Sequence, residues 1–182
     1  AEAARRLAVH DRALALDTNL AEAHAVKARI LSEGGRHDDA STEIEVALRL
    51  DPESYEVNRA AAYLRFRQKR LHESILHFEK ALALMETDVS SANMLMTCYL
   101  AVGDGEAAHR AARITLERAR KTLAQDPSNG AAMGFCGYAL ALLGQAESAK
   151  GWMSRAMLID PDNINMRYNF ACSLTVLKET EA

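Results

Sequence analysis

The sequence predicts an all-α fold, an α-α superhelix in which antiparallel helix pairs stack one on the next. Composition is the first indication. Hydrophobic residues make up 49% of the 182 residues, yet only 5% are aromatic and only three are proline. Alanine, leucine, arginine and glutamate dominate, and these residues lose little side-chain entropy when they enter a helix. The second indication is a period of 34 residues in the sequence.

The period is clearest in three Asp-Pro pairs, Asp51-Pro52, Asp126-Pro127 and Asp160-Pro161. The last two prolines are 34 residues apart, and the first two are 75 apart, which is two periods and seven further residues. Internal repeats of this length are typical of solenoids, in which each unit is one pair of helices. We therefore predict a single array of helix pairs.

Four full repeats follow from this period, over residues 21–54, 55–88, 89–129 and 130–163, in the single array 1–182. Residues 1–20 match only the second helix of a repeat, and 164–182 only the first helix, so we expect a fragment of a longer protein. The seven extra residues of the third repeat are close to two helical turns. They predict one lengthened helix over 105–125.

Small side chains recur at fixed places in each repeat, where two helices approach closely. The eighth, twentieth and twenty-seventh positions hold residues such as Ala28, Ala40 and Ala47, whereas the twenty-fourth is bulky, as in Ile44 and Phe78. Glycine or lysine is expected at the turn between paired helices, where a left-handed backbone ends a helix. These turn residues are Gly35, Lys69, Gly103, Gly144 and Lys178.

This pattern of small, large and small residues with a closing proline resembles the tetratricopeptide repeat (TPR) over essentially the whole chain. Repeat 130–163 fits best, and repeat 55–88 fits least, with Arg65 at the usual aromatic position and Glu86 in place of proline. The resemblance implies a right-handed superhelix that binds a protein partner and is not an enzyme. A groove enzyme is a less favoured alternative.

A narrower resemblance concerns the run DPDNINMRYNFACSL and the RAMLID before it. It is similar to the last repeats of TPR regions in bacterial class III adenylate cyclases and related signalling proteins. This resemblance implies a regulatory or scaffold module of a larger bacterial signalling protein, whose cyclase or other output domain lies outside these residues.

In TPR proteins the first helix of each repeat lines the concave groove, through positions two, five, nine, twelve and thirteen. Carried over to this sequence, the resemblance implies a receptor for an extended peptide or an acidic tail, because arginine binds carboxylates and asparagine binds peptide groups. An ordinary solvated helix face, with Tyr63 packed between repeats, is the alternative. The implied groove residues are Arg29, Glu33, Arg59, Tyr63, Phe66, Arg67, Asn93, Thr97, Tyr138 and Tyr168.

Metal and catalytic chemistry is not predicted. Cys98, Cys136 and Cys172 lie in successive repeats but at positions that point to different sides of their helices, so three thiols do not converge on one ion. The sequence has no CxxC, HExxH, GxxxxGK, GxGxxG or GxSxG run. We predict no cofactor, no metal and no catalytic residues.

Charge and hydropathy argue against nucleic-acid and membrane partners. The net charge is −3, and the basic stretch between His109 and Lys121 lacks interleaved aromatic residues, as expected of a solvated helix face. No apolar run approaches the roughly 18 residues that a membrane span needs. The odd cysteine count suits a reducing compartment, so we expect a cytoplasmic protein.

The last predicted helix, 164–178, carries Phe170, Leu174 and Leu177 on a face that no later helix of this sequence covers. A solenoid repeat buries its apolar face only against a neighbour. We therefore expect this helix to be covered by further sequence or by a second molecule. Self-association of an adenylate cyclase-like protein through this helix is the alternative function.

Overall fold

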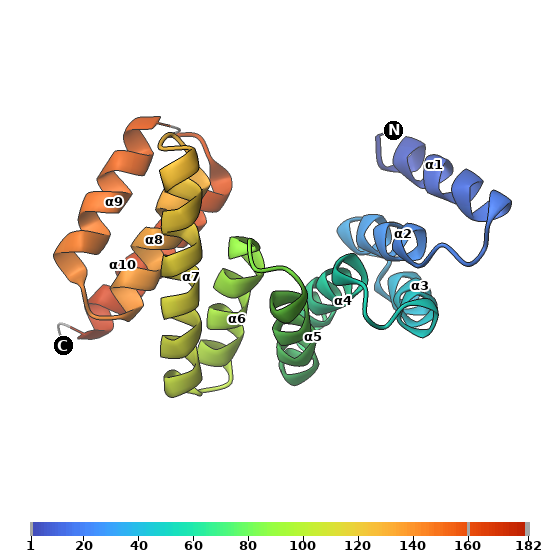
Figure 1. Cartoon of the computed structure of the whole chain (residues 1–182), viewed down its shortest axis with the longest axis horizontal. Coiled ribbons are helices and arrows are strands. Elements are labelled where there is room, and N and C mark those ends of the chain that lie inside the picture. The colour runs from blue at the N-terminus through green and yellow to red at the C-terminus, as the bar shows by residue number, and fades with distance from the viewer. Residues whose placement is uncertain (1, 160, 181–182) are drawn as a thin grey trace. The chain divides into compact units, whose positions relative to one another are not determined.

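The computed structural model describes the backbone of residues 2–159 and 161–180, and the side chains of 7–159, 161–164 and 166–177. Ten helices and no strand lie within these residues (Figure 1). The predicted all-α helical repeat fold is confirmed. The chain divides into two compact units, residues 1–85 (unit 1) and residues 86–182 (unit 2).

Unit 1 contains five helices, and its core lies between two antiparallel pairs. The helices are α1 (Glu2–Leu16), α2 (Ala21–Glu33), α3 (His37–Leu50), α4 (Tyr55–Arg67) and α5 (Leu71–Leu84). Helix α2 pairs with α3 and α4 pairs with α5, while α4 also packs against α2 and α3. Alanines at the contacts, such as Ala28 and Ala40, let these helices approach, and Ile44 fills the space beside them.

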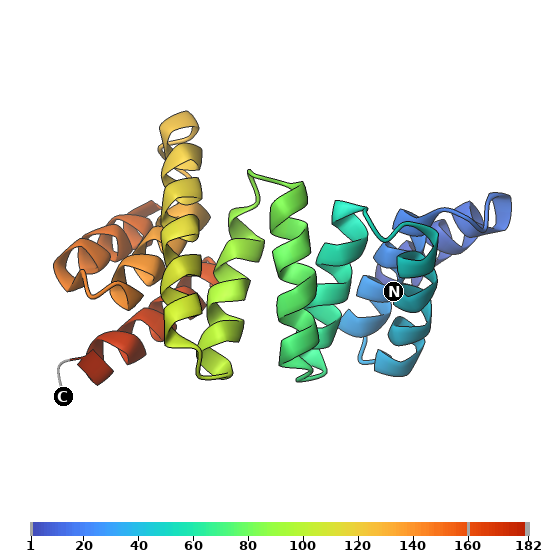
Figure 2. The same ribbon diagram turned by 60° about the horizontal axis from the view of Figure 1, so that its bottom comes forward.

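Unit 2 contains the other five helices. They are α6 (Val89–Ala101), α7 (Gly105–Gln125), α8 (Gly130–Leu142), α9 (Ala146–Ile159) and α10 (Ile164–Thr180). Helix α6 pairs with α7 and α8 pairs with α9. Helix α7 has 21 residues, and Figure 2 shows it in yellow, extending well past the end of its partner α6. Its bounds coincide with those that the seven-residue insertion predicts.

Helices α4, α6, α8 and α10 each start with a capping side chain at the repeat boundary, whereas α2, which follows Leu20, has none. Ser54, Asp88 and Asn129 accept hydrogen bonds from the backbone N–H three residues later, at 3.4, 3.0 and 2.9 Å. Asn163 does the same for Met166 N–H at 3.0 Å. These caps satisfy N–H groups that have no partner inside the helix. They explain why the helices begin at the repeat boundaries.

The turns inside the pairs are left-handed at four of the five predicted residues. Gly35, Gly103 and Gly144 have φ of 79°, 82° and 74°, and Lys69 has φ of 59°. Glycine adopts this conformation without strain. At Lys69 the conformation is strained, because the Cβ lies close to the backbone of the same residue. The prediction of a turn at the fifth residue, Lys178, is wrong, because α10 continues to Thr180.

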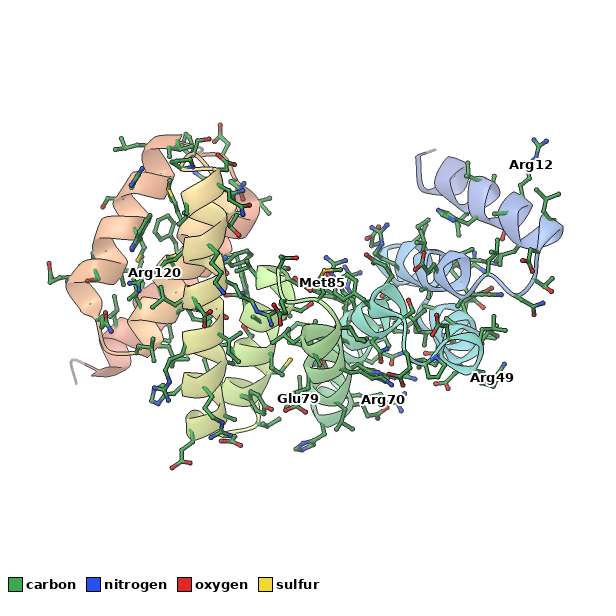
Figure 3. All side chains as sticks on the ribbon, viewed as in Figure 1. Arg12, Arg49, Arg70, Glu79, Met85 and Arg120 are labelled. Carbon is green, nitrogen blue, oxygen red and sulfur yellow. The ribbon has the colours of Figure 1, made fainter. Side chains whose placement is uncertain are left out.

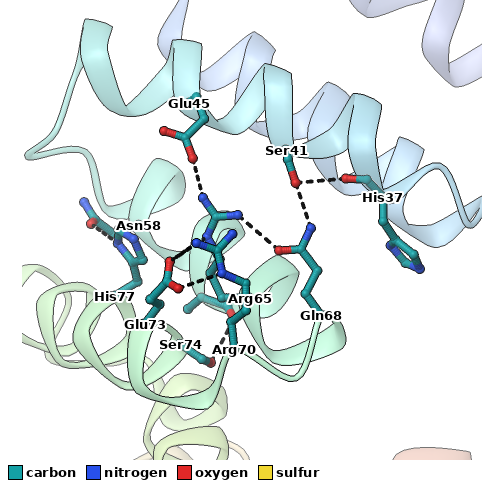
Figure 4. A network of polar contacts seen from close by, with 11 residues as sticks. His37, Ser41, Glu45, Asn58, Arg65, Gln68, Arg70, Glu73, Ser74 and His77 are labelled. Carbon is teal, nitrogen blue, oxygen red and sulfur yellow. Dashed lines mark hydrogen bonds and ion pairs between the residues drawn. The ribbon is translucent and has the colours of Figure 1, made fainter.

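Arg65 of α4 is buried in the middle of unit 1, at the position where an aromatic residue is usual, with only 3% of its surface exposed. Figure 4 shows its guanidinium between Glu45 of α3 and Glu73 of α5, and it donates to Gln68 at 3.1 Å. A buried guanidinium needs such partners because leaving a charge unpaired is costly. The network links the two helix pairs.

Candidate functional site

A cavity of about 240 Å³ lies on unit 1 between α2 and α4. Its walls come from residues 29–33 of α2 and 59–67 of α4, so the packing of α4 against α2 creates it. Five of the predicted groove residues line it, namely Arg29, Glu33, Arg59, Tyr63 and Arg67. Ser32, Ala60 and Leu64 complete the lining.

The cavity lining is positively charged, with three arginines and one glutamate. Arg29 forms an ion pair with Glu33 along α2, at 3.3 Å between Nη1 and Oε1. Arg67 forms no ion pair within the described residues, and its side chain is exposed. An arginine that is not neutralised offers a planar pair of donors to a carboxylate or another anion.

Tyr63 forms an aromatic wall whose position is fixed from both sides. Its ring stands edge-on to Phe78 of α5, with centroids 5.1 Å apart and an interplanar angle of 83°. The guanidinium carbon of Arg59 lies 5.4 Å from the Tyr63 ring centroid, a cation–π distance. The sequence left open whether Tyr63 packs between repeats or faces the groove; in the structure its ring packs against Phe78 and also lines the cavity.

Ser32 adds a polar atom to the cavity that the sequence did not single out. It is 5% exposed, and its hydroxyl has no hydrogen-bond partner within the described residues. Buried hydroxyls are normally paired, so one that faces a cavity suggests a ligand atom as its partner. Ser32 stands at position twelve of its repeat, which is a groove position, and that place in the period was the available signal.

The remaining predicted groove residues do not join this cavity. Phe66 is half-buried outside it, and Thr97 of α6 is also half-buried. Asn93 and Tyr138 are only 5% and 3% exposed, so neither offers its side chain to a partner as the resemblance implies. Tyr168 on α10 is 58% exposed.

Tyr138 is buried because another helix of its own unit covers it. Burial raises the pKa of the Tyr138 hydroxyl to about 12, while a hydrogen bond with the Thr97 side chain acts in the opposite direction. Cys172 and Tyr168, both on α10, are close enough to raise it further. The side of α8 that would face a groove is therefore occupied.

The described residues form neither a metal-ligand cluster nor a membrane-spanning helix. They contain no group of three or more His, Cys, Asp or Glu side chains arranged to hold a metal ion. Burial raises the pKa of the Cys136 thiol to about 11, which makes it a poor nucleophile. Within the part of the chain described, no helix combines the length and apolar character that crossing a membrane requires.

Comparison with solved structures places the fold among TPR proteins. A crystal structure of MamA aligns with a TM-score of 0.62 and 19% identity, covering 85% of this chain and 86% of MamA. YrrB, described as a TPR protein with an unusual peptide-binding site, aligns with a TM-score of 0.60 and 22% identity, covering 92% and 82% of the two chains.

A chain in the structure of Naa15/Naa10 bound to HypK-THB aligns at 20% identity and a TM-score of 0.56, over 81% of this chain and 21% of that one. No protein-family model and no curated protein matches the sequence. The likenesses support a TPR-like repeat fold.

Proposed function

We propose that this chain is a protein-interaction module, and that the cavity between α2 and α4 binds a peptide segment that carries a carboxylate. The observation that supports it best is the lining itself: three arginines against one glutamate, around an aromatic wall and a buried hydroxyl. The peptide-binding description of YrrB belongs to that protein, and it supports a peptide ligand here by analogy of fold.

Four of the lining residues would contact the peptide directly in this proposal. Arg59 and Arg67 receive the carboxylate oxygens, because guanidinium groups form paired, charge-assisted hydrogen bonds with them. Ser32 bonds a peptide carbonyl or the carboxylate itself. Tyr63 contacts the apolar part of the peptide, which its ring can cover at little entropic cost.

The test uses an array of synthetic octapeptides in which each Asp- or Glu-containing sequence is paired with its Asn or Gln counterpart. The chain should capture acidic members and bind their amide counterparts at least about tenfold more weakly, since a hydrogen bond to a charged group is worth about 1.5–3 kcal/mol. The double variant Arg59→Glu with Arg67→Glu should lose this capture.

Arg49→Glu is the matched control, because Arg49 is exposed on α3 and points away from the unit in Figure 3. It reverses one charge of the same kind without touching the cavity. Undiminished capture of acidic peptides by the Arg59/Arg67 double variant would contradict the proposal, as would equal loss in Arg49→Glu.

Self-association is a second candidate function, favoured by apolar side chains that are exposed on α9 and α10. Leu158 is 86% exposed, Ile164 is 78% exposed and Leu174 is 49% exposed. Exposed apolar side chains that gather on one surface can mark a docking site. Light scattering over a concentration series should show dimers that Leu174→Glu dissociates; a monomer at every concentration would remove this candidate.

The wider setting of the module is also a proposal. We infer from the resemblance of 155–174 to TPR regions of bacterial class III adenylate cyclases that the parent is a larger signalling protein acting in the cytoplasm. The coding sequence on either side of this segment is the direct test. A neighbouring cyclase or other output domain would support the inference, and a flanking sequence without one would refute it.

A further inference from the structure

Three of the residues that line the unit 1 cavity follow one another along a single face of α4. Arg59, Tyr63 and Arg67 are each four residues apart, and all three border the cavity. Residues four apart in a helix lie on the same face, about 6 Å from one another along the axis. Tyr63 therefore stands midway between two arginines whose Cα atoms are about 12 Å apart along α4.

Both of these arginines can donate to an acidic group of a ligand. Arg67 is exposed and forms no ion pair within the described residues. The contact of Arg59 with Glu56 is long, at 3.9 Å between Nη1 and Oε2, and both side chains reach the solvent. An exposed pair of this kind contributes little, so a bound carboxylate can replace Glu56. Arg29 is less available, because its own partner Glu33 is closer, at 3.3 Å.

The part of the cavity between the two arginines is apolar. Ala60 and Leu64 line it together with the Tyr63 ring. That ring is held edge-on by Phe78, with the centroids 5.1 Å apart. The α4 wall thus presents basic, apolar and basic surface in turn, and a complementary ligand presents acidic, apolar and acidic groups at the same spacing.

The width of the cavity favours an extended ligand over a helical one. Distributed over the roughly 12 Å between the two arginines, about 240 Å³ corresponds to a mean cross-section of roughly 20 Å². A helix that is about 10 Å wide has a cross-section of roughly 80 Å². An extended chain is narrower, and it places every second side chain on one side, about 6.6–6.8 Å apart. This distance is close to the spacing of about 6 Å between successive lining residues of α4.

Ser32 on the α2 wall supplies a contact that the backbone of an extended ligand needs. Its side chain is 5% exposed, and its hydroxyl has no hydrogen-bond partner within the described residues. An extended chain carries N–H and C=O groups that have no partner of their own, and a hydroxyl can donate to such a carbonyl. With Ser32 bonded to the peptide backbone, both arginines remain for acidic side chains.

We propose that the ligand of this cavity is an extended segment in which two acidic residues flank an apolar one, with a single residue of any kind in each gap. The first and fifth residues of this five-residue motif bind Arg59 and Arg67, and the third contacts Tyr63. The inference rests on the proposed binding of acidic peptides, to which it adds the number and spacing of the acidic residues.

The first measurement compares three labelled peptides of one composition, with both ends capped, by fluorescence anisotropy. Glu-Ser-Leu-Ser-Glu has the motif, and Glu-Glu-Leu-Ser-Ser brings the two carboxylates together. Glu-Ser-Ser-Leu-Glu keeps the carboxylates apart but moves leucine to the other side of an extended chain. The motif peptide should bind at least about tenfold more tightly than Glu-Glu-Leu-Ser-Ser, which reaches only one arginine. It should also bind more tightly than Glu-Ser-Ser-Leu-Glu, which loses the contact with Tyr63.

Charge exchange then assigns each acidic residue to its arginine. Arg59→Glu and Arg67→Glu should each weaken binding of the motif peptide at least about tenfold. Each variant should regain binding to one of two mixed peptides, Lys-Ser-Leu-Ser-Glu and Glu-Ser-Leu-Ser-Lys, and the two variants should prefer opposite ones. Arg49→Glu, the control on α3, should keep the preference of the unaltered chain. Because Arg67 is exposed, Arg67→Glu gives a result even where Arg59→Glu disturbs the Tyr63 ring.

Three results would overturn the motif. Equal binding of the three peptides of one composition would show that the spacing is not recognised. A failure of Arg67→Glu to regain either mixed peptide, or the same preference in both variants, would show that the arginines do not act at separate ends. Tighter binding of a helical peptide with Glu, Leu and Glu four residues apart would make the ligand a helix. Each result leaves the capture of acidic peptides intact, whereas no capture of any acidic peptide would refute the proposed function as well.

Discussion

Helices α4 and α8 hold the same place in their repeats but carry opposite kinds of surface. At the fifth and ninth positions α4 has Arg59 and Tyr63, which border a cavity, whereas α8 has Gly134 and Tyr138, which lie beneath α10. A charged, bulky residue at the fifth position keeps a helix away and offers donors to a ligand. At the fifth position of α8, a Cβ would lie at ordinary contact distance from α10. The same place in the repeat therefore borders a cavity in α4 and a neighbouring helix in α8.

The largest effect is expected from removing the aromatic support of the unit 1 cavity. Phe78 is fully buried and holds Tyr63 in place. Phe78→Ala should lower the free energy of unfolding of unit 1 by about 3–5 kcal/mol, through lost burial and the cavity that remains. It should also weaken capture of acidic peptides.

Urea unfolding followed by circular dichroism measures the change. Leu76→Ala, on the same helix but 64% exposed, should be nearly neutral. Equal stabilities of the two variants would mean that unit 1 is not packed around Phe78 as described.

The two glycines of α8 allow a sharper comparison within unit 2. A Cβ at Gly137 would lie 3.0 Å from the Met153 side chain of α9, tighter than at Gly134, where the nearest atom of α10 is 3.5 Å away. Gly137→Val should destabilise unit 2 by about 1–3 kcal/mol, because the α8–α9 contact has no room for it.

Gly134→Ala should cost less, since its methyl group reaches only ordinary contact distance. Thermal unfolding of both variants, with Gly151→Ala as a solvent-exposed helical control, tests this order. A larger loss in Gly134→Ala than in Gly137→Val would contradict the spacing described between α8 and its two neighbours.

The turns of the two units provide a smaller comparison. Lys69 ends α4 in the left-handed region that glycine occupies at Gly103 in unit 2. Gly103→Ala should cost about 1 kcal/mol, because a Cβ is strained there. Lys69→Gly should stabilise unit 1 by less than about 1 kcal/mol, since the more flexible glycine loses more entropy on folding. Calorimetric melting shows whether each variant is more or less stable than the unaltered chain. A destabilised Lys69→Gly chain would contradict the strain at Lys69.

The smallest expected effect is a pH dependence of the stability of unit 1, which arises from His77. Burial, followed by the charge of Arg65, lowers the pKa of His77 below its usual range, and His77 also hydrogen-bonds with Asn58 at 3.1 Å. Because the pKa of His77 is lower in the folded chain, the unfolded chain binds the proton more readily. The contribution of His77 to the free energy of unfolding is therefore present above about pH 6.5 and lost as the pH falls below it.

Unfolding in urea at pH 7.5 and pH 5.5 tests this direction. The decrease in stability at the lower pH should be smaller in His77→Gln than in the unaltered chain. The only histidine of unit 2 is the exposed His109. A His77→Gln chain with the same pH dependence as the original would show that His77 is not the group responsible.

Helix positions could be predicted from the sequence because the repeat fixes them locally. The turn glycines act within a few residues, and so do the caps that the structure adds at Ser54, Asp88 and Asn129, so the repeat spacing is enough to place the helices. The grouping of Arg29, Arg59 and Tyr63 around one cavity also follows from the period, since α2 and α4 pack side by side.

Features that depend on contacts between distant residues could not be predicted. The repeat pattern gives α10 the signature of an ordinary first helix, and nothing local shows that it settles on α8 and buries Tyr138. The expectation that Phe170, Leu174 and Leu177 form one uncovered face fails for Leu177, which is 4% exposed. Likewise, Arg65 stands where the repeat pattern expects an aromatic residue. Its burial is explained only by its partners Glu45 and Glu73 on other helices.

The most direct measurement of the contrast between the two units is a hydrogen-exchange footprint taken with and without an acidic octapeptide that the chain captures. The account predicts slower exchange in α2 and α4 around Ser32 and Tyr63, and no change in α8. Slower exchange in α8 around Tyr138, with α2 and α4 unchanged, would contradict the assignment of the peptide site to unit 1.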